Sequence, residues 1–210
     1  MKGIILSTLL ILASSFSFGQ DAKAKAILDK LSAKTKSYST VNVEFTSKIK
    51  SDAVDETSKG TAYMKGKKFY IKSGKYTLIS NGIKQWVINS DEKEVYVSDY
   101  EEDEDAITPN KILTIWEDDF KYKYNGIGTV GGVAIEKVEL YPKNPGEAQF
   151  HTIYMAVDTK NNKPKQIIVK SKDGSRMTYT FTKFEGNKEM SDSKFVFNKG
   201  NYPGYRIEED

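Results

Sequence analysis

Residues 76–98 read YTLISNGIKQWVINSDEKEVYVS, and the organisation of the chain can be worked out from this stretch outward. Asn81-Gly82 lies between two apolar-rich runs, which is the strongest local signal for a β-hairpin. Both residues tolerate the positive φ of a type I′ turn, so we predict a two-residue turn that sets Ser80 opposite Ile83. Residues 91–93 then turn the chain back once more. The stretch therefore predicts a three-stranded antiparallel meander.

The two faces of this meander are both partly apolar, because successive side chains of a strand point to opposite faces. One face carries Ile79, Trp86 and Ile88, and the other carries Tyr76, Leu78 and Val87. A sheet with one wet face would show a cleaner alternation of apolar and polar residues. We therefore expect both faces to be covered by other parts of the chain.

Composition favours one β-rich domain. The chain has 210 residues, of which 38% are hydrophobic, and its 13 Tyr and 10 Phe favour sheet over helix. The formal charge is only +3, and lysines alternate with acids along the predicted strands, so a nucleic-acid-binding protein is disfavoured. No Cys is present, which excludes disulfides, thiolate metal sites and Cys nucleophiles.

The first nineteen residues have the order of a secretory signal peptide. Lys2 provides the basic region, Ile4 to Ala13 is the apolar region, and Ser17-Phe18-Gly19 supplies small residues before a cleavage site. We expect residues 1–19 to be removed, residues 20–210 to form a single domain, and the mature protein to be exported and soluble. No Cys follows the apolar run, so we expect no lipid anchor on this chain.

After the signal peptide, the pattern changes from helix to strands. Asp21 to Ser37 has apolar residues at helical spacing, with Asp21 as the expected N-cap. From Thr40 onward the period is two, and about eleven strand-like segments follow with turn signals between them. The last of these is Phe195-Val196-Phe197, followed by an acidic tail.

The β pattern is interrupted between Tyr100 and Phe120. Glu101 to Asp105 is an acidic run, which is usually a solvated loop; a calcium site or a docking patch for a basic partner are the alternatives. Thr108-Pro109 then starts a short apolar helix. This helix lies inside a long connection, where lids are often found. Its apolar residues are Ile112, Leu113, Ile115 and Trp116.

Motifs for catalysis, metal binding and cofactor binding are missing. His151 is the only histidine and lies in a strand-like run, where a structural or exposed role is more common than a catalytic one. There is no Gly-x-Ser-x-Gly elbow, no phosphate-binding glycine loop and no zinc-ligand spacing. We therefore expect a protein that is not an enzyme and has no cofactor. The many apolar strand residues fit either a filled core or a lipophilic cavity.

Five segments, in the same order along most of the chain, resemble those of a known family. They are Val43-Glu44-Phe45-Thr46 after a helix, Gly60 to Lys65 followed by Lys68-Phe69, Ile79-Ser80-Asn81-Gly82 with Trp86 four residues later, Thr108-Pro109 opening an apolar helix, and Ser193 to Phe197. On these segments the chain resembles the LolA family of periplasmic outer-membrane lipoprotein carriers. The resemblance implies an α+β, mainly β fold, an incomplete antiparallel β-barrel with helices covering its concave, apolar side.

The resemblance also implies a function and a site. The cavity would hold the acyl chains of a lipoprotein that an inner-membrane ABC-type releasing complex delivers and an outer-membrane acceptor receives, with the carrier as a monomer. The expected cavity lining is Val43, Phe45, Tyr63, Phe69, Ile71, Ile79, Trp86 and Ile88, with Ile112, Leu113, Ile115 and Trp116 as the lid helix. We accordingly expect Trp86→Asp to abolish lipid uptake and to leave the sheet intact.

The chain departs from the family at one position. The family commonly has an Arg after the glycine-aromatic strand, which ties the sheet to the lid. Here the segment reads Lys65-Gly66-Lys67-Lys68, so Lys67 and Lys68 are the candidates for sheet-to-lid contacts. A lysine cannot reproduce the forked hydrogen bonds of a guanidinium group. A second function therefore stays open, that of a LolA-like periplasmic lipid-binding or lipoprotein-sensing module with a different cargo.

Overall fold

The computed structural model describes residues 9–100, 115–117 and 120–209, and for residues 9–20 and Ile115 it describes the backbone only. Within these ranges, twelve strands form one sheet in the order β12-β6-β5-β4-β3-β2-β1-β11-β10-β9-β8-β7. The two end strands, β12 and β7, do not pair with each other, so the sheet is not closed into a barrel. The expected incomplete β-barrel is confirmed.

The elements have the following bounds. The strands are β1 (Val41–Lys50), β2 (Asp55–Lys65), β3 (Lys68–Ser73), β4 (Tyr76–Ser80), β5 (Lys84–Asn89), β6 (Glu94–Asp99), β7 (Phe120–Val130), β8 (Val133–Pro142), β9 (Phe150–Asp158), β10 (Lys163–Ser171), β11 (Arg176–Gly186) and β12 (Arg206–Glu209). The helices are α1 (Leu9–Lys36) and the short 3₁₀ helices η2 (Ile115–Glu117), η3 (Asp192–Phe195) and η4 (Lys199–Asn201). Neighbouring strands are antiparallel, except that β12 runs parallel to β6.

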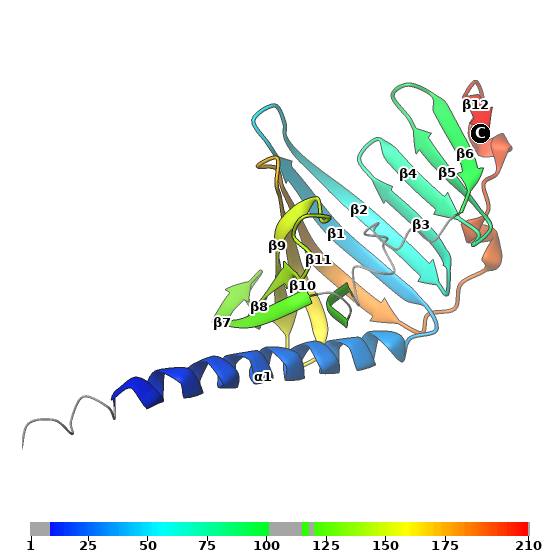
Figure 1. Cartoon of the computed structure of the whole chain (residues 1–210). Helices are drawn as coiled ribbons and strands as arrows, with labels where there is room; N and C mark the ends of the chain where they lie inside the picture. Colours follow the sequence, from blue (N-terminus) through cyan, green and yellow to red (C-terminus); the bar gives the residue numbers. More distant parts are fainter. Residues whose placement is uncertain (1–8, 101–114, 118–119, 210) are drawn as a thin grey trace, which may run out of the picture.

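Helix α1 packs on the concave face of this curved sheet, near one end of the strands. Its buried residues are Ala24, Ile27, Leu28 and Leu31, as the apolar spacing predicts. Figure 1 shows α1 crossing one end of the sheet, while the β1–β2 and β10–β11 turns lie at the opposite end. We call that opposite end, where the β3–β4 and β5–β6 turns also lie, the open end.

Two details of the β4–β5 hairpin differ from the prediction. Ser80 pairs with Gln85 and not with Ile83, because the two-residue turn is shifted by one position, to Gly82-Ile83. The backbone N–H of Asn81 donates to the carbonyl oxygen of Lys84 at 3.2 Å, and Asn81 Oδ1 accepts hydrogen bonds from the backbone N–H groups of Ile83 and Lys84. Only Gly82 has a positive φ in this turn, so the type I′ assignment was wrong. The register moves by two residues, which leaves every side chain on its predicted face.

The expected N-cap and the expected last strand were also wrong. Asp21 lies inside α1, because the helix already includes Leu9 and no proline interrupts residues 9–20. Phe195 ends the 3₁₀ helix η3, which Ser191 caps by accepting from the N–H of Ser193, and the last strand is β12 in the acidic tail. Among the described helices, none is both long enough and apolar enough to cross a bilayer.

The described part of the chain has two apolar clusters, one on each face of the sheet. The larger cluster joins α1 to the concave face of β1–β3 and β8–β11. The smaller one lies on the convex face, around Ile79, Ile88, Val95 and Val97. The convex face of the meander is therefore covered, as predicted. Its other face is not: Leu78 and Val87 are only half-buried there and Tyr76 is 43% exposed, so the expectation that both faces are covered was wrong for this face.

Candidate functional site

The concave face carries a continuous apolar row across five strands. Val43 pairs with Ala62, Ala62 with Ile71, Ile71 with Leu78, and Leu78 with Val87, so these side chains point to the same face. Val43 and Ala62 are only 3% and 6% exposed, whereas Ile71, Leu78 and Val87 are half-buried. The row therefore begins in the core beneath α1 and continues as accessible apolar surface.

Aromatic rings form the wall next to this row. A β-bulge between Glu44 and Phe45 sets Phe45 opposite Phe181, and the Phe45 ring meets the Tyr179 ring edge-on with centroids 6.1 Å apart. The Phe45 ring lies over Gly60, where an added Cβ would be 2.3 Å from its Cζ atom. The missing side chain at Gly60 thus makes the space that this ring occupies.

The polarity of the concave face changes toward the open end. Ser47 and Ser73 hydrogen-bond to each other through their hydroxyl groups at 3.0 Å, and Ser47 Oγ lies 3.4 Å from the carbonyl oxygen of Ser58. We call Ser47 and Ser73 the hydroxyl lip. On β1, Ser47 is the next residue after Val43 and Phe45 to point to the concave face. An elongated ligand with an apolar tail and a polar end would match this gradient.

A short segment on the concave side is tied to α1. Trp116 in η2 is 4% exposed and belongs to the larger apolar cluster. The neighbouring Glu117 accepts hydrogen bonds from the hydroxyl of Ser32 and the ammonium group of Lys36, both on α1. Burial acts to raise the pKa of Glu117, but these two hydrogen bonds outweigh it and lower the pKa below its usual value. The carboxylate therefore holds Trp116 against the helix at neutral pH.

Comparison with known proteins gives the family. Residues 35–198 match the family described as outer membrane lipoprotein carrier protein LolA. The chain belongs to the LolA family. Among curated proteins, none matches the sequence significantly.

Solved structures resemble this LolA-family chain in fold at low sequence identity. An uncharacterized conserved protein from Thermus thermophilus has a TM-score of 0.58 and 9% identity, with 90% of this chain and 99% of that chain covered. LprF from Mycobacterium bovis has a TM-score of 0.52 and 11% identity, with 81% and 96% covered. A LolA superfamily protein from Nitrosomonas europaea is less similar, with a TM-score of 0.44 and 11% identity over 83% and 97% of the two chains.

The eight residues expected to line one cavity are divided between the two faces. Val43, Phe45, Phe69 and Ile71 lie on the concave face with the larger cluster. The other four, Tyr63, Ile79, Trp86 and Ile88, lie on the convex face. Each is adjacent along its strand to a concave residue, and successive side chains of a strand point to opposite faces. One cavity cannot include both sets. Both sets are apolar, so the sequence pattern by itself does not separate them.

Four concave residues were missed by the sequence reasoning: Ala62, Met64, Leu78 and Val87. Leu78 and Val87 had been placed on the face opposite Trp86, which is correct, but that face had not been linked to Val43. The link requires the pairing of β1 with β2, β2 with β3 and β3 with β4. Once these registers are known, the alternation along each strand identifies all four residues.

The convex set is covered by the C-terminal segment, residues 187–209. The ring of Trp86 stacks on that of Phe197 with centroids 6.1 Å apart, and Phe197 stacks on Tyr202 at 5.2 Å. Lys194 Nζ lies 3.7 Å from the centroid of the Tyr63 ring, a cation–π contact. Trp86 is therefore part of the attachment of this segment to the sheet.

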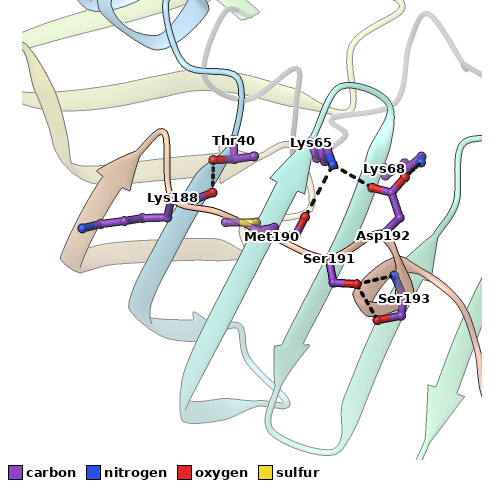
Figure 2. Close-up of polar contacts among 8 residues, drawn as sticks. All are labelled: Thr40, Lys65, Lys68, Lys188, Met190, Ser191, Asp192 and Ser193. Atoms are coloured by element: carbon purple, nitrogen blue, oxygen red, sulfur yellow. Dashed lines mark hydrogen bonds and ion pairs between the residues drawn. The ribbon is translucent and has the colours of Figure 1, made fainter.

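The lysines of the β2–β3 turn make a contact that the sequence reasoning did not foresee. Lys65 Nζ and Lys68 Nζ each lie 2.8 Å from one carboxylate oxygen of Asp192, and Lys65 also reaches the carbonyl oxygen of Met190 at 3.4 Å (Figure 2). These hydrogen bonds lower the pKa of Asp192 to about 2. Lys68 thus contacts the C-terminal segment. Lys67 is exposed in the turn, and its contact with the lid stays a prediction.

Part of the expected lid lies outside the described residues. This applies to Ile112 and Leu113, and also to the acidic run from Glu101 to Asp105. Ile115 is described by its backbone only, and Trp116 is the member of the set whose side chain is placed, in the larger cluster. His151 is exposed on β9, with Nδ1 2.8 Å from the hydroxyl oxygen of Thr152.

Proposed function

We propose that this protein carries the acyl chains of lipoproteins on its concave face and transports them across the periplasm. The observation that carries the proposal is the apolar row of Val43, Ala62, Ile71, Leu78 and Val87, which leaves the core and becomes accessible from Ile71 onward. Membership of the LolA family, whose description names a lipoprotein carrier, supports the same function.

The energetics of acyl chains explain why such a carrier is needed and how it can release its cargo. Each buried methylene contributes about 0.8 kcal/mol, so an acyl chain does not leave a membrane for water without a protein to cover it. Trp116 already occupies part of the concave cluster and is attached to α1 through Glu117. Incoming acyl chains would displace side chains such as Trp116 from their apolar contacts. The loss of those contacts offsets part of the binding free energy of the acyl chains, so the net affinity is lower and release is possible.

The route of transport follows from the same proposal. Residues 1–19 would direct export and be cleaved, so that the mature domain acts in the periplasm. An inner-membrane ABC-type complex would load the carrier, and an outer-membrane acceptor would unload it. No catalytic step is required, because the cargo moves down a series of apolar binding sites.

Native mass spectrometry of the protein purified from the periplasm with a co-expressed lipoprotein tests this function. We expect a one-to-one adduct with the acylated lipoprotein, and no adduct when its lipidated Cys is replaced. A matched pair of variants strengthens the test. Leu78→Asp, on the concave face, should lose the adduct, whereas Val196→Asp, on the exposed outer side of the C-terminal segment, should keep it. A spectrum of protein without adduct under gentle conditions would contradict the proposal.

The engagement of Lys65 and Lys68 by Asp192 favours one alternative. If these lysines hold the C-terminal segment and do not control a lid, the protein would bind and retain a lipid or a lipoprotein as a sensor. Transfer from loaded protein to acceptor vesicles separates the two functions. A carrier releases its cargo to vesicles that contain an acceptor, whereas a sensor keeps it.

A further inference from the structure

Three basic side chains lie next to one another at the open end of the sheet. Lys50 on β1 pairs with Arg176 on β11, and Arg176 pairs with Lys170 on β10. Directly paired residues point to the same face, and here it is the convex face. Like charges in this arrangement destabilise a sheet. We call these three residues the basic row.

None of the three residues of the basic row forms an ion pair with a residue that the structure describes. Within the residues that the structure describes, neither Lys50 nor Arg176 has an ion pair or a side-chain hydrogen bond. Lys170 lies against Tyr154, with Nζ 4.8 Å from the ring centroid. Asp55, which lies directly opposite Lys50 on β2, forms its ion pair with Lys48 at 3.1 Å, and Asp173 in the β10–β11 turn accepts from the N–H of Ser175 at 2.9 Å.

Exposed apolar side chains lie beside the basic row, at the same end of the sheet. Ile49 and Val54 are 40% and 41% exposed, although both are aliphatic and flank the β1–β2 turn. Figure 1 shows this turn beside the β10–β11 turn, at the end of the sheet away from α1. The tip therefore combines unpaired positive charge with accessible aliphatic surface. This combination is typical of protein surfaces that bind anionic membranes.

We propose that the open end of the sheet docks on the surface of an anionic phospholipid bilayer. The basic row contacts headgroup phosphates, for which Arg176 can supply two parallel hydrogen bonds. Ile49 and Val54 enter the interfacial region, where burial of their side chains adds to the electrostatic attraction. Docking in this orientation turns the hydroxyl lip and the apolar row of the concave face toward the membrane.

This proposal goes beyond lipoprotein transport, because docking requires no acyl chain in the protein. Membrane association and acyl-chain binding are measured separately and depend on different residues. Loss of docking with retained acyl binding would leave the proposed function intact. Loss of acyl binding with retained docking would leave the present proposal intact.

The test is co-sedimentation of the purified protein with vesicles of phosphatidylcholine alone or mixed with phosphatidylglycerol. We expect binding to the mixed vesicles only, and a decrease as NaCl is raised. Because each basic residue near an anionic surface adds substantially to binding, Lys50→Glu with Arg176→Glu should lower the bound fraction at least about tenfold. The same charge change at Lys59 and Lys137, two exposed lysines of the convex face away from the tip, is the matched control and should bind like the unaltered protein.

Further arms test the source of the anion and the apolar contribution. The variant with Lys50→Gln and Arg176→Gln introduces no new charge and should give an intermediate loss of binding. It replaces the charge-reversal variant if that variant does not fold. Val54→Ser should lower binding to mixed vesicles at constant charge. Equal binding of the reversal and control variants would overturn the proposal, as would equal binding to neutral vesicles. Shifts of the Arg176 side-chain NMR signals with inorganic phosphate, without vesicle binding, would indicate a free-anion site and also overturn it.

Discussion

Replacing Leu78 by Asp should make acyl-chain binding weak and dependent on pH. Leu78 is half-buried in the middle of the concave apolar row, between Ile71 and Val87. A bound acyl chain covers this position, so the new carboxyl group must be neutral in the complex. Protonating a group with an ordinary pKa of about 3.9 at about pH 7 costs about 4 kcal/mol, which corresponds to an affinity about 1,000-fold weaker. Lowering the pH by about two units should recover about 100-fold of this loss.

The assay is a fluorescence titration with a monoacylglycerol analogue, whose headgroup does not titrate in this range. Leu78→Asn removes the same apolar contact without adding an ionisable group, so its loss should be smaller and independent of pH. Val196→Asp adds the same charge on the C-terminal segment and should bind like the unaltered protein. Circular dichroism and the melting temperature establish that each variant folds. A loss below about tenfold for Leu78→Asp, or no recovery at low pH, would show that acyl chains do not cover this row.

Three further predictions concern the support of the site. Gly60→Ala should destabilise the protein by about 1–3 kcal/mol, because the new Cβ would collide with the Phe45 ring and the Lys72 carbonyl oxygen. Thermal unfolding measures this loss, and adding Phe45→Leu to the same chain should recover part of it. Trp86→Asp should make the C-terminal segment accessible to proteases, because it removes the stack on Phe197. In contrast to the expectation from sequence alone, the affinity for acyl chains should stay within about twofold of that of the unaltered protein. A selective loss of acyl binding would contradict the placement of Trp86 on the convex face. The folded-state pKa of Asp192, about 2, lies below its ordinary 3.8, so this contact stabilises the protein above about pH 4 and the contribution is lost as the pH falls toward 2. Hydrogen exchange, corrected for the intrinsic pH dependence of amide exchange, should show lower protection of the C-terminal segment at the lower pH, and Asp192→Asn should show low protection at both pH values.

Local sequence signals predicted the individual elements well. The apolar spacing of Ala24, Ile27, Leu28 and Leu31 correctly gave the buried face of α1, and alternation gave the strands and the two-sided meander. The errors at element ends also have local causes. The side chain of Asn81 accepts from two N–H groups of a turn that is shifted by one residue, and the cap at Ser191 favours a 3₁₀ helix at Phe195 in place of the expected strand. Hydrophobic pattern does not report on such side-chain hydrogen bonds.

The candidate site was predicted only in part. Phe45 and Phe69 were placed correctly on the face that holds the apolar row, but Trp86 was assigned to it because it is aromatic and lies in the central hairpin. Aromatic side chains cover either face of a sheet equally well. The sequence has no local signal for which of two apolar faces will meet a helix and which will meet a segment more than a hundred residues later.

The amino-acid sequence was sufficient for the features that depend on neighbours along the chain: a helix, a series of strands, an apolar face on each side of the meander, and membership of the LolA family. The assignment of those faces required the folded chain. A one-residue difference in any register exchanges the two faces, and each register depends on strands far apart in sequence, such as β1 and β11. The same long-range pairing brings Lys50, Arg176 and Lys170 together, and it sets Asp192 between Lys65 and Lys68. These contacts arise from chain topology, so no pattern within a single segment of the sequence contains them.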